Sequence, residues 1–106
     1  NMADLNLIAK YQLDQLASIM TVNADIRIEL NSHTDSRGEN LYNLELSQRR
    51  ANTAVNYLLQ KGLSKDRMVA KGYGETKLLN GCKDDVVCAE EDHALNRRTE
   101  IKIFIR

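Results

Sequence analysis

One stretch, residues 26–59, combines a strand pattern, a polar loop and a helix pattern, and it strongly restricts the folds open to this chain. Apolar Ile26, Ile28 and Leu30 alternate with polar residues, which is the period of a strand with one buried face. Residues 33–40 are polar, charged or Gly, and apolar residues then return at a helical spacing. Because two rigid elements hold such a loop, its side chains are well placed to bind a ligand.

The rest of the chain predicts further helices and strands in a simple order. The expected elements are a helix over 5–20, a strand over 26–32, a helix from 40 or 44 to 61, a strand over 68–73 and a strand over 99–105. Gly62 is expected to end the second helix in a left-handed conformation, and residues 76–95 are expected to be irregular. In the last strand, the side chains of Ile101, Ile103 and Ile105 are predicted to point inward. This order favours an α+β fold in which helices pack on one face of a small mixed β-sheet.

Length and composition narrow the classes of protein that the chain can represent. A chain of 106 residues favours a single domain spanning 1–106, and a hydrophobic fraction of 42% is typical of a globular one. Lys+Arg and Asp+Glu both total 15, so the formal net charge of zero argues against a nucleic-acid partner. The sequence has no apolar run of transmembrane length, and residues 1–106 are not expected to include a signal peptide. Its abrupt start is expected to mark a fragment of a longer protein.

A series of polar and glycine motifs runs from the loop to the last strand. In order, they are Thr34-Asp35-x-x-Gly38, Asn43-x-x-Leu46-Ser47-x-x-Arg50-Ala51, Gly62, Arg67, Gly72-x-Gly74-Glu75 and Asn96-Arg97-Arg98-x-Glu100. This ordered pattern resembles the OmpA-like domain, the periplasmic peptidoglycan-binding module of outer-membrane porins, peptidoglycan-associated lipoproteins and flagellar stator proteins. The resemblance covers residues 7–106 and implies a two-layer sandwich.

Two features qualify this resemblance. The family carries an apolar strand before the first helix, whereas only Asn1 to Asn6 precede that helix here. The first family strand is therefore expected to be missing or very short. If it is very short, residues 2–7 are expected to form its remnant. The segment from Asn80 to His93 resembles versions of the domain from Bacteroidetes-type bacteria.

The resemblance implies a function and a set of site residues. It implies non-catalytic binding of the diaminopimelate residue of the peptidoglycan stem peptide, which anchors a parent protein of the Gram-negative outer membrane to the cell wall at the periplasmic face. Asp35 and Arg50 match the residues that grip diaminopimelate in the family. Asn43 and Arg97 match residues that line the same site. Thr34 is also predicted to bind the ligand. Alternatively, Thr34 has a structural role and braces the loop.

The chemistry of the matched residues suits that ligand. The free end of meso-diaminopimelate carries an ammonium and a carboxylate, so Asp35 can take the first and the planar Arg50 guanidinium the second. Asn43 and Arg50 are seven positions apart and project from one face of a helix. Without the resemblance, Asp35 is a turn residue, and Arg50 is solvated or paired with Glu39 or Glu45.

The two cysteines, Cys82 and Cys88, allow more than one interpretation. A local disulfide in an oxidising compartment is the first, and two free thiols are another. A metal site built from both cysteines and His93, with Asp84 or Asp85, is a sharper alternative. Its Cys-x5-Cys spacing is wider than that of the usual zinc patterns. The prediction is therefore a disulfide, with no metal and no cofactor.

Two further functions compete with wall binding. The first is an interaction domain that forms homodimers through an exposed sheet edge. The second is a hydrolase of wall peptides with Asp35 and His33 as acid and base, and it lacks a nucleophile–base pair or a metal to activate water.

Overall fold

The computed structural model describes residues 5–84 and 86–105, apart from the side chains of residues 94 and 95. In chain order its elements are α1 (Leu7–Val22), β1 (Ile26–His33), α2 (Asn40–Gln60), the short 3₁₀ helix η1 (Lys65–Arg67), β2 (Met68–Gly74), α3 (Glu90–Asn96) and β3 (Arg98–Ile105). Helices and a mixed sheet together confirm the predicted α+β class. The remnant strand expected within residues 2–7 falls mostly outside the described residues.

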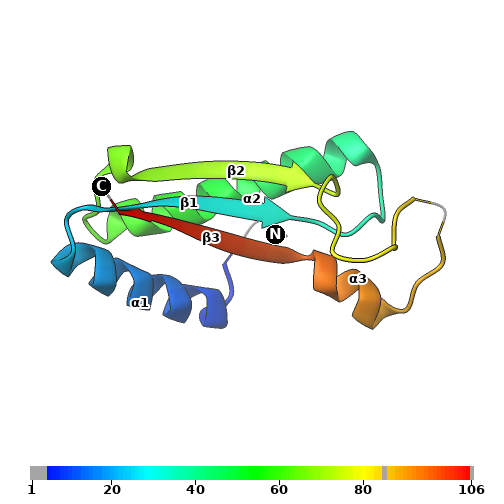
Figure 1. Ribbon diagram of the computed structural model, residues 1–106, viewed down its shortest axis with the longest axis horizontal. Coiled ribbons are helices and arrows are strands. Elements are labelled where there is room, and N and C mark those ends of the chain that lie inside the picture. The colour runs from blue at the N-terminus through cyan, green and yellow to red at the C-terminus, as the bar shows by residue number, and fades with distance from the viewer. Residues whose placement is uncertain (1–4, 85, 106) are drawn as a thin grey trace.

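The sheet has the order β2-β1-β3, with β1 in the centre. β1 pairs in parallel with β2 and antiparallel with β3, so that Leu30 lies opposite both Ala70 and Ile101. The carboxyl ends of β1 and β2 and the start of β3 therefore meet at one end of the sheet, and α3 lies beyond that end (Figure 1). This shared end is where the polar loop after β1 leaves the sheet.

The hydrophobic core lies between the sheet and the helices α1 and α2. Met20 of α1, Leu30 of β1 and Leu58 of α2 have no exposed surface, and Met68 of β2 joins the same cluster. Each such side chain contributes about 1.5–3 kcal/mol to the free energy of folding when it is fully buried. The core thus fixes α2 and β1, the two elements that flank the polar loop.

The predicted burial of the β3 isoleucines is wrong. Their register opposite Ile28 and Leu30 places Ile101 and Ile103 on the helix-facing side of the sheet, as the alternation predicts. Ile101, Ile103 and Ile105 are nevertheless 43%, 56% and 76% exposed. The reason is that β3 is an edge strand, while the core cluster of α1 and α2 side chains packs over β1 and β2.

The predicted irregular segment 76–95 is also partly wrong, because its last residues form the helix α3. The first turn of this short helix contains Glu90, Glu91 and Asp92. Negative side chains at a helix N-terminus interact favourably with the helix dipole, and they explain why the helix begins there. α3 thus brings acidic side chains to the end of the sheet where the polar loop lies.

Two glycines serve different purposes at the ends of α2 and β2. Gly62 has a φ of +94° and ends α2 in the left-handed conformation, as predicted. At Gly72 the need is space, because a Cβ atom there would lie 2.2 Å from the backbone nitrogen of Gln48. β2 and α2 therefore pack backbone against backbone, and the Gly74 amide donates a 2.8 Å hydrogen bond to Ser47 Oγ nearby.

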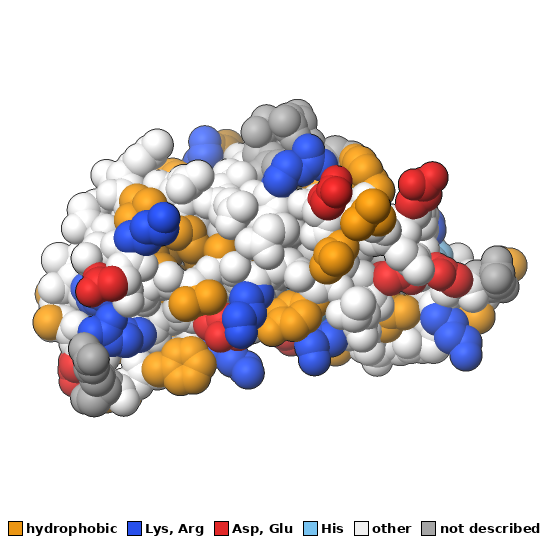
Figure 2. Space-filling model, turned by 90° about the horizontal axis from the view of Figure 1, so that it is seen from above, with side chains coloured by type: hydrophobic (Ala, Val, Ile, Leu, Met, Phe, Trp, Pro, Cys, Tyr) orange, Lys and Arg blue, Asp and Glu red, His pale blue; other side chains and the backbone are white. Residues whose placement is uncertain are grey.

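The molecular surface is mixed in character. On the face shown in Figure 2, basic and acidic side chains are interspersed, with hydrophobic side chains between them. This distribution agrees with the net charge of zero and offers no broad basic surface on this face for a nucleic acid. Within residues 5–84 and 86–105, no helix has both the length and the apolar character needed to cross a membrane.

Candidate functional site

A cavity of about 340 Å³ lies where the loop after β1, the first half of α2 and the junction between α3 and β3 meet. It is lined by Thr34, Asp35, Arg37, Tyr42, Asn43, Leu46, Arg50 and Arg97. The structure therefore brings all five predicted ligand-binding side chains to one place, although they are spread over residues 34–97 of the chain.

The loop after β1 is held by its own hydrogen bonds. The Thr34 amide donates to the Gly74 carbonyl at 2.8 Å, which extends the pairing with β2 by one residue. Thr34 Oγ1 donates to the Asp35 carbonyl at 3.0 Å, and the Arg37 amide donates to Asp35 Oδ1 at 3.0 Å. Such an Asp-centred turn fixes the carboxylate relative to the backbone. Thr34 thus braces the loop and also lines the cavity.

Asn43 attaches this loop to α2. Its side chain is buried, and its Nδ2 donates to the carbonyls of Arg37 at 2.9 Å and Asp35 at 3.4 Å. Arg50 also lines the cavity from α2, as the seven-residue spacing predicts. The amide of Asn43 therefore sets the position of the loop carboxylate relative to the helix that contributes Arg50.

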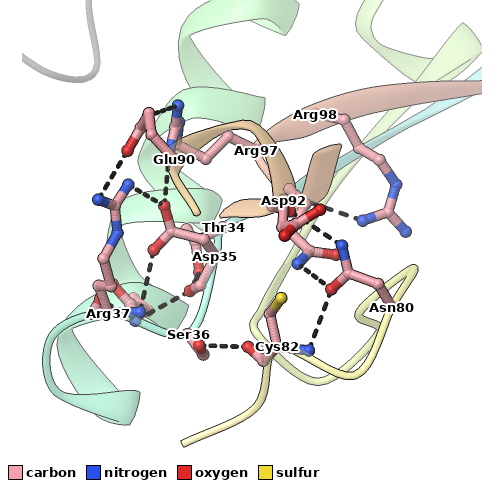
Figure 3. Close-up of polar contacts among 12 residues, drawn as sticks. Thr34, Asp35, Ser36, Arg37, Asn80, Cys82, Glu90, Asp92, Arg97 and Arg98 are labelled. Atoms are coloured by element: carbon pink, nitrogen blue, oxygen red, sulfur yellow. Dashed lines mark hydrogen bonds and ion pairs between the residues drawn. The ribbon is translucent and has the colours of Figure 1, made fainter. Parts of the chain in front are cut away.

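Asp35 is a fixed anion. Its Oδ2 accepts hydrogen bonds from Arg37 Nη2 at 2.8 Å and from Arg97 Nη1 at 2.7 Å (Figure 3). Burial acts to raise the pKa of Asp35, but the hydrogen bonds from Arg37 and Arg97 outweigh it and lower the pKa to about 2. The carboxylate therefore keeps its charge at every physiological pH.

The cations of the cavity crowd one another. Burial lowers the pKa of Arg50, and the positive charge of Arg97 lowers it further. Arginine still stays protonated in proteins, so both side chains are charged. An anion that enters the cavity beside Arg50 and Arg97 would relieve this repulsion.

Glu90 completes the charged network, and the sequence analysis missed it together with Arg37. Glu90 Oε2 lies 2.8 Å from Arg37 Nη1, and Glu90 Oε1 lies 2.5 Å from Arg97 Nη2 (Figure 3). Hydrogen bonds from Arg97 and Arg37 lower the pKa of Glu90. The signal that could have found Glu90 is the acidic triplet 90–92, which is typical of a helix start.

Asn80 and Asn96 fix the position of α3. Asn96 accepts a hydrogen bond from the Leu79 amide at 2.7 Å and donates to Asn80 Oδ1 at 2.9 Å. Asn80 in turn donates to the Asp92 carbonyl at 2.9 Å and accepts from the Cys82 amide at 3.1 Å (Figure 3). The start and the end of α3 are thus tied to the same preceding segment.

Cys82 and Cys88 are joined in a disulfide. Ser36 Oγ donates to the Cys82 carbonyl, so the disulfide segment is attached to the loop after β1. Within the described residues, the group with metal-ligating spacing is Cys82, Cys88 and Asp92, and two of its members are in the disulfide and offer no thiolate. His93 does not belong to this group, and Asp85 lies outside the described residues.

His33 does not take part in the cavity. Its buried ring stacks on Tyr73 with a centroid distance of 5.2 Å, and its Nε2 lies 3.1 Å from Glu100 Oε1. Asp35 is held by two guanidiniums instead. The acid–base pair that the hydrolase hypothesis requires is therefore not formed by these two residues.

Known proteins resemble this chain in sequence and in structure. The model of the OmpA family matches residues 1–91. The peptidoglycan-associated lipoprotein of Buchnera aphidicola is 36% identical over 90 residues, which cover 84% of this chain and 49% of that protein. The crystal structure of the peptidoglycan-associated lipoprotein from Burkholderia pseudomallei superimposes with a TM-score of 0.85 at 25% identity, over 96% of this chain and 82% of that one.

A third similar structure is that of the cell wall anchor of the T6SS from Pseudomonas aeruginosa. Its TM-score is 0.78 at 25% identity, over 98% of this chain and 71% of that one. The chain spans between 12% and 49% of the length of the first curated relatives that it matches. The family match includes Thr34, Asp35, Asn43 and Arg50, while Arg97 lies beyond it. The chain belongs to the OmpA family.

Proposed function

We propose that the chain binds peptidoglycan through the diaminopimelate residue of its stem peptide, and that it anchors its parent protein to the cell wall without catalysis. Similar proteins are named peptidoglycan-associated lipoproteins and a cell wall anchor, which supports this role. Relatives named as outer membrane proteins support a location at the periplasmic face of a Gram-negative outer membrane. A Bacteroidetes-type origin stays a prediction.

The single observation that carries the proposal is one cavity lined by a fixed carboxylate, that of Asp35, and by three guanidiniums, of which those of Arg50 and Arg97 would face the ligand carboxylate. A zwitterion needs this combination. Its ammonium would contact Asp35 Oδ1, which accepts one hydrogen bond in this structure and has the lone-pair capacity for a second. Its carboxylate would lie beside Arg50 and Arg97, where a charged hydrogen bond contributes about 1.5–3 kcal/mol.

The test is calorimetric titration of the chain with a stem peptide that contains meso-diaminopimelate, with the lysine-containing peptide as the comparison. The lysine peptide lacks the second carboxylate, so its affinity should be lower by about 1–3 kcal/mol. Arg50→Ala should reduce this preference, because only Arg97 would then remain beside the ligand carboxylate, whereas Glu91→Gln, an exposed change on α3, should preserve it. A folded wild-type chain that binds neither peptide would contradict the proposal.

The exposed edge of β3 favours a second candidate function, the formation of homodimers. Ile101, Ile103 and Phe104 are each between 43% and 56% exposed on this edge strand, and an unpaired apolar edge is a template for strand pairing. Sedimentation equilibrium tests this function, because a dimer through β3 should dissociate in Ile103→Lys. A monomer at all concentrations in the wild-type chain would exclude it.

A further inference from the structure

Four charged side chains, three of which line the cavity, form a closed ring of alternating sign. Arg37 and Arg97 each use their two terminal nitrogens to contact two different carboxylates, those of Asp35 and Glu90. All four contacts lie between 2.5 and 2.8 Å (Figure 3). Neither arginine therefore makes a paired contact with a single carboxylate, which is the strongest geometry for a guanidinium.

The two carboxylates of this ring differ in how firmly they are held. The Asp35 side chain is 9% exposed and is fixed by a backbone amide as well as by both arginines. The Glu90 side chain is 58% exposed, and within the ring it contacts the two guanidiniums. Ion pairs at exposed positions are weak, since water solvates the separated charges well. Glu90 is therefore the member of the ring that can leave.

A ligand carboxylate that reaches Arg97 would share the charge of this guanidinium with Glu90. Arg97 lines the cavity, and its Nη1 is taken by Asp35 and its Nη2 by Glu90. Each terminal nitrogen carries two N–H groups, so a ligand carboxylate that reaches Arg97 would lie close to Glu90, and the repulsion between the two carboxylates favours the release of Glu90. The exchange replaces one carboxylate by another and leaves the contact of Arg97 with Asp35 intact.

We propose that Glu90 is an internal carboxylate that orients Arg37 and Arg97 in the absence of ligand and competes with the carboxylate of an incoming ligand. This inference rests on the proposed function, because it concerns how the same cavity admits a zwitterion. The backbone of α3 is tied through Asn80 and Asn96, so the exchange is a rotation of the Glu90 side chain, not a movement of the helix. Glu90 thus lowers the affinity and keeps the site ordered.

The test compares Glu90→Gln with Glu91→Gln, because both variants remove one exposed negative charge from the first turn of α3. With the meso-diaminopimelate stem peptide, Glu90→Gln should bind about 2- to 10-fold more tightly than the wild-type chain, since it removes a weak competing ion pair. Glu91→Gln should bind like the wild-type chain. Raising the ionic strength should reduce the gain, because salt screens the exposed pair. Equal or weaker binding by Glu90→Gln would overturn the inference.

A second measurement separates this inference from the proposed function. Acetate serves as a carboxylate probe, and NMR follows the side-chain N–H signals of Arg37 and Arg97 during its titration. In Glu90→Gln these signals should shift at several-fold lower acetate concentrations than in the wild-type chain or in Glu91→Gln. Identical titrations in the three proteins would overturn the competition, whatever the stem peptide does. If the stem peptide did not bind but the acetate titrations differed as expected, the proposed function would be overturned and the competition by Glu90 would stand.

Discussion

The loop after β1 and the helix α3 both bring a carboxylate to the same two guanidiniums, and they hold it in different ways. The loop fixes Asp35 by backbone hydrogen bonds and by the amide of Asn43. α3 is fixed by a disulfide segment and two asparagines, but its Glu90 side chain is 58% exposed and is held by the two guanidiniums. A buried, hydrogen-bonded carboxylate is suited to bind a ligand, and an exposed one is suited to exchange with it.

The largest effect should follow from removal of the buried carboxylate charge. Asp35→Asn should weaken binding of the meso-diaminopimelate peptide by about 2–5 kcal/mol, because it removes the buried negative charge that would contact the ligand ammonium. Calorimetric titration measures this change, and circular dichroism checks the fold. If Asp35→Asn bound as tightly as the wild-type chain, the two carboxylates would not differ in the way that we propose.

The disulfide should contribute more to the stability of α3 and the segment before it than to ligand binding. Replacement of Cys82 and Cys88 by Ser should lower the free energy of unfolding by about 2 kcal/mol, the contribution that a short closed loop makes on the chain-entropy model. Denaturant titration measures the loss, and the wild-type chain under reducing conditions is the control. A loss of binding as large as that of Asp35→Asn would show that α3 does more than present Glu90.

The pH dependence of stability should reveal the fixed carboxylate. The pKa of Asp35 is lowered to about 2 in the folded chain from an ordinary value of 3.8. A lowered pKa contributes stability above the ordinary value, and this contribution is lost as the pH falls from about 4 to about 2. It amounts to about 2 kcal/mol. The difference in unfolding free energy between the wild-type chain and Asp35→Asn should therefore shrink over this range, and a constant difference would contradict the assignment.

The smallest effect should come from a change of Arg37, which contacts both Asp35 of the loop and Glu90 of α3. Arg37→Lys keeps the positive charge but replaces a planar fork by a single ammonium, which cannot span both carboxylates in the same geometry. The Arg37 side chain is half exposed, so the free energy of unfolding should fall by less than about 1 kcal/mol. Thermal unfolding measures this change. A larger loss would mean that Arg37 is held as firmly as Asp35 and that its ion pairs are not weak exposed ones.

The sequence predicted the site residues around the loop after β1 better than it predicted Glu90 on α3. The side chains of Asp35, Asn43, Arg50 and Arg97 occur in an ordered pattern, and they line one cavity. Glu90 escaped prediction because its helix is seven residues long and follows an irregular segment without apolar periodicity. Pairwise contacts between distant residues, such as that of Arg37 with Glu90, leave no periodic signal in a single sequence.

The β3 isoleucines show a different limit of sequence analysis. Alternation correctly assigned Ile101 and Ile103 to the helix-facing side of the sheet. It could not show whether a helix covers that part of the sheet, because coverage depends on where α1 and α2 pack. The left-handed Gly62 was predictable, since that conformation depends on local sterics alone.

The missing side chain of Gly72 determines more than the packing of one strand. It lets β2 lie directly against the backbone of α2, and β2 in turn positions Thr34 through the Gly74 carbonyl. A methyl group at this position would therefore push apart the two layers that present Asp35 and Arg50. The close approach of β2 to α2 at Gly72 therefore helps to set the distance between the carboxylate of Asp35 and the guanidinium of Arg50, and with it the spacing of the two ligand charges that the cavity can accept.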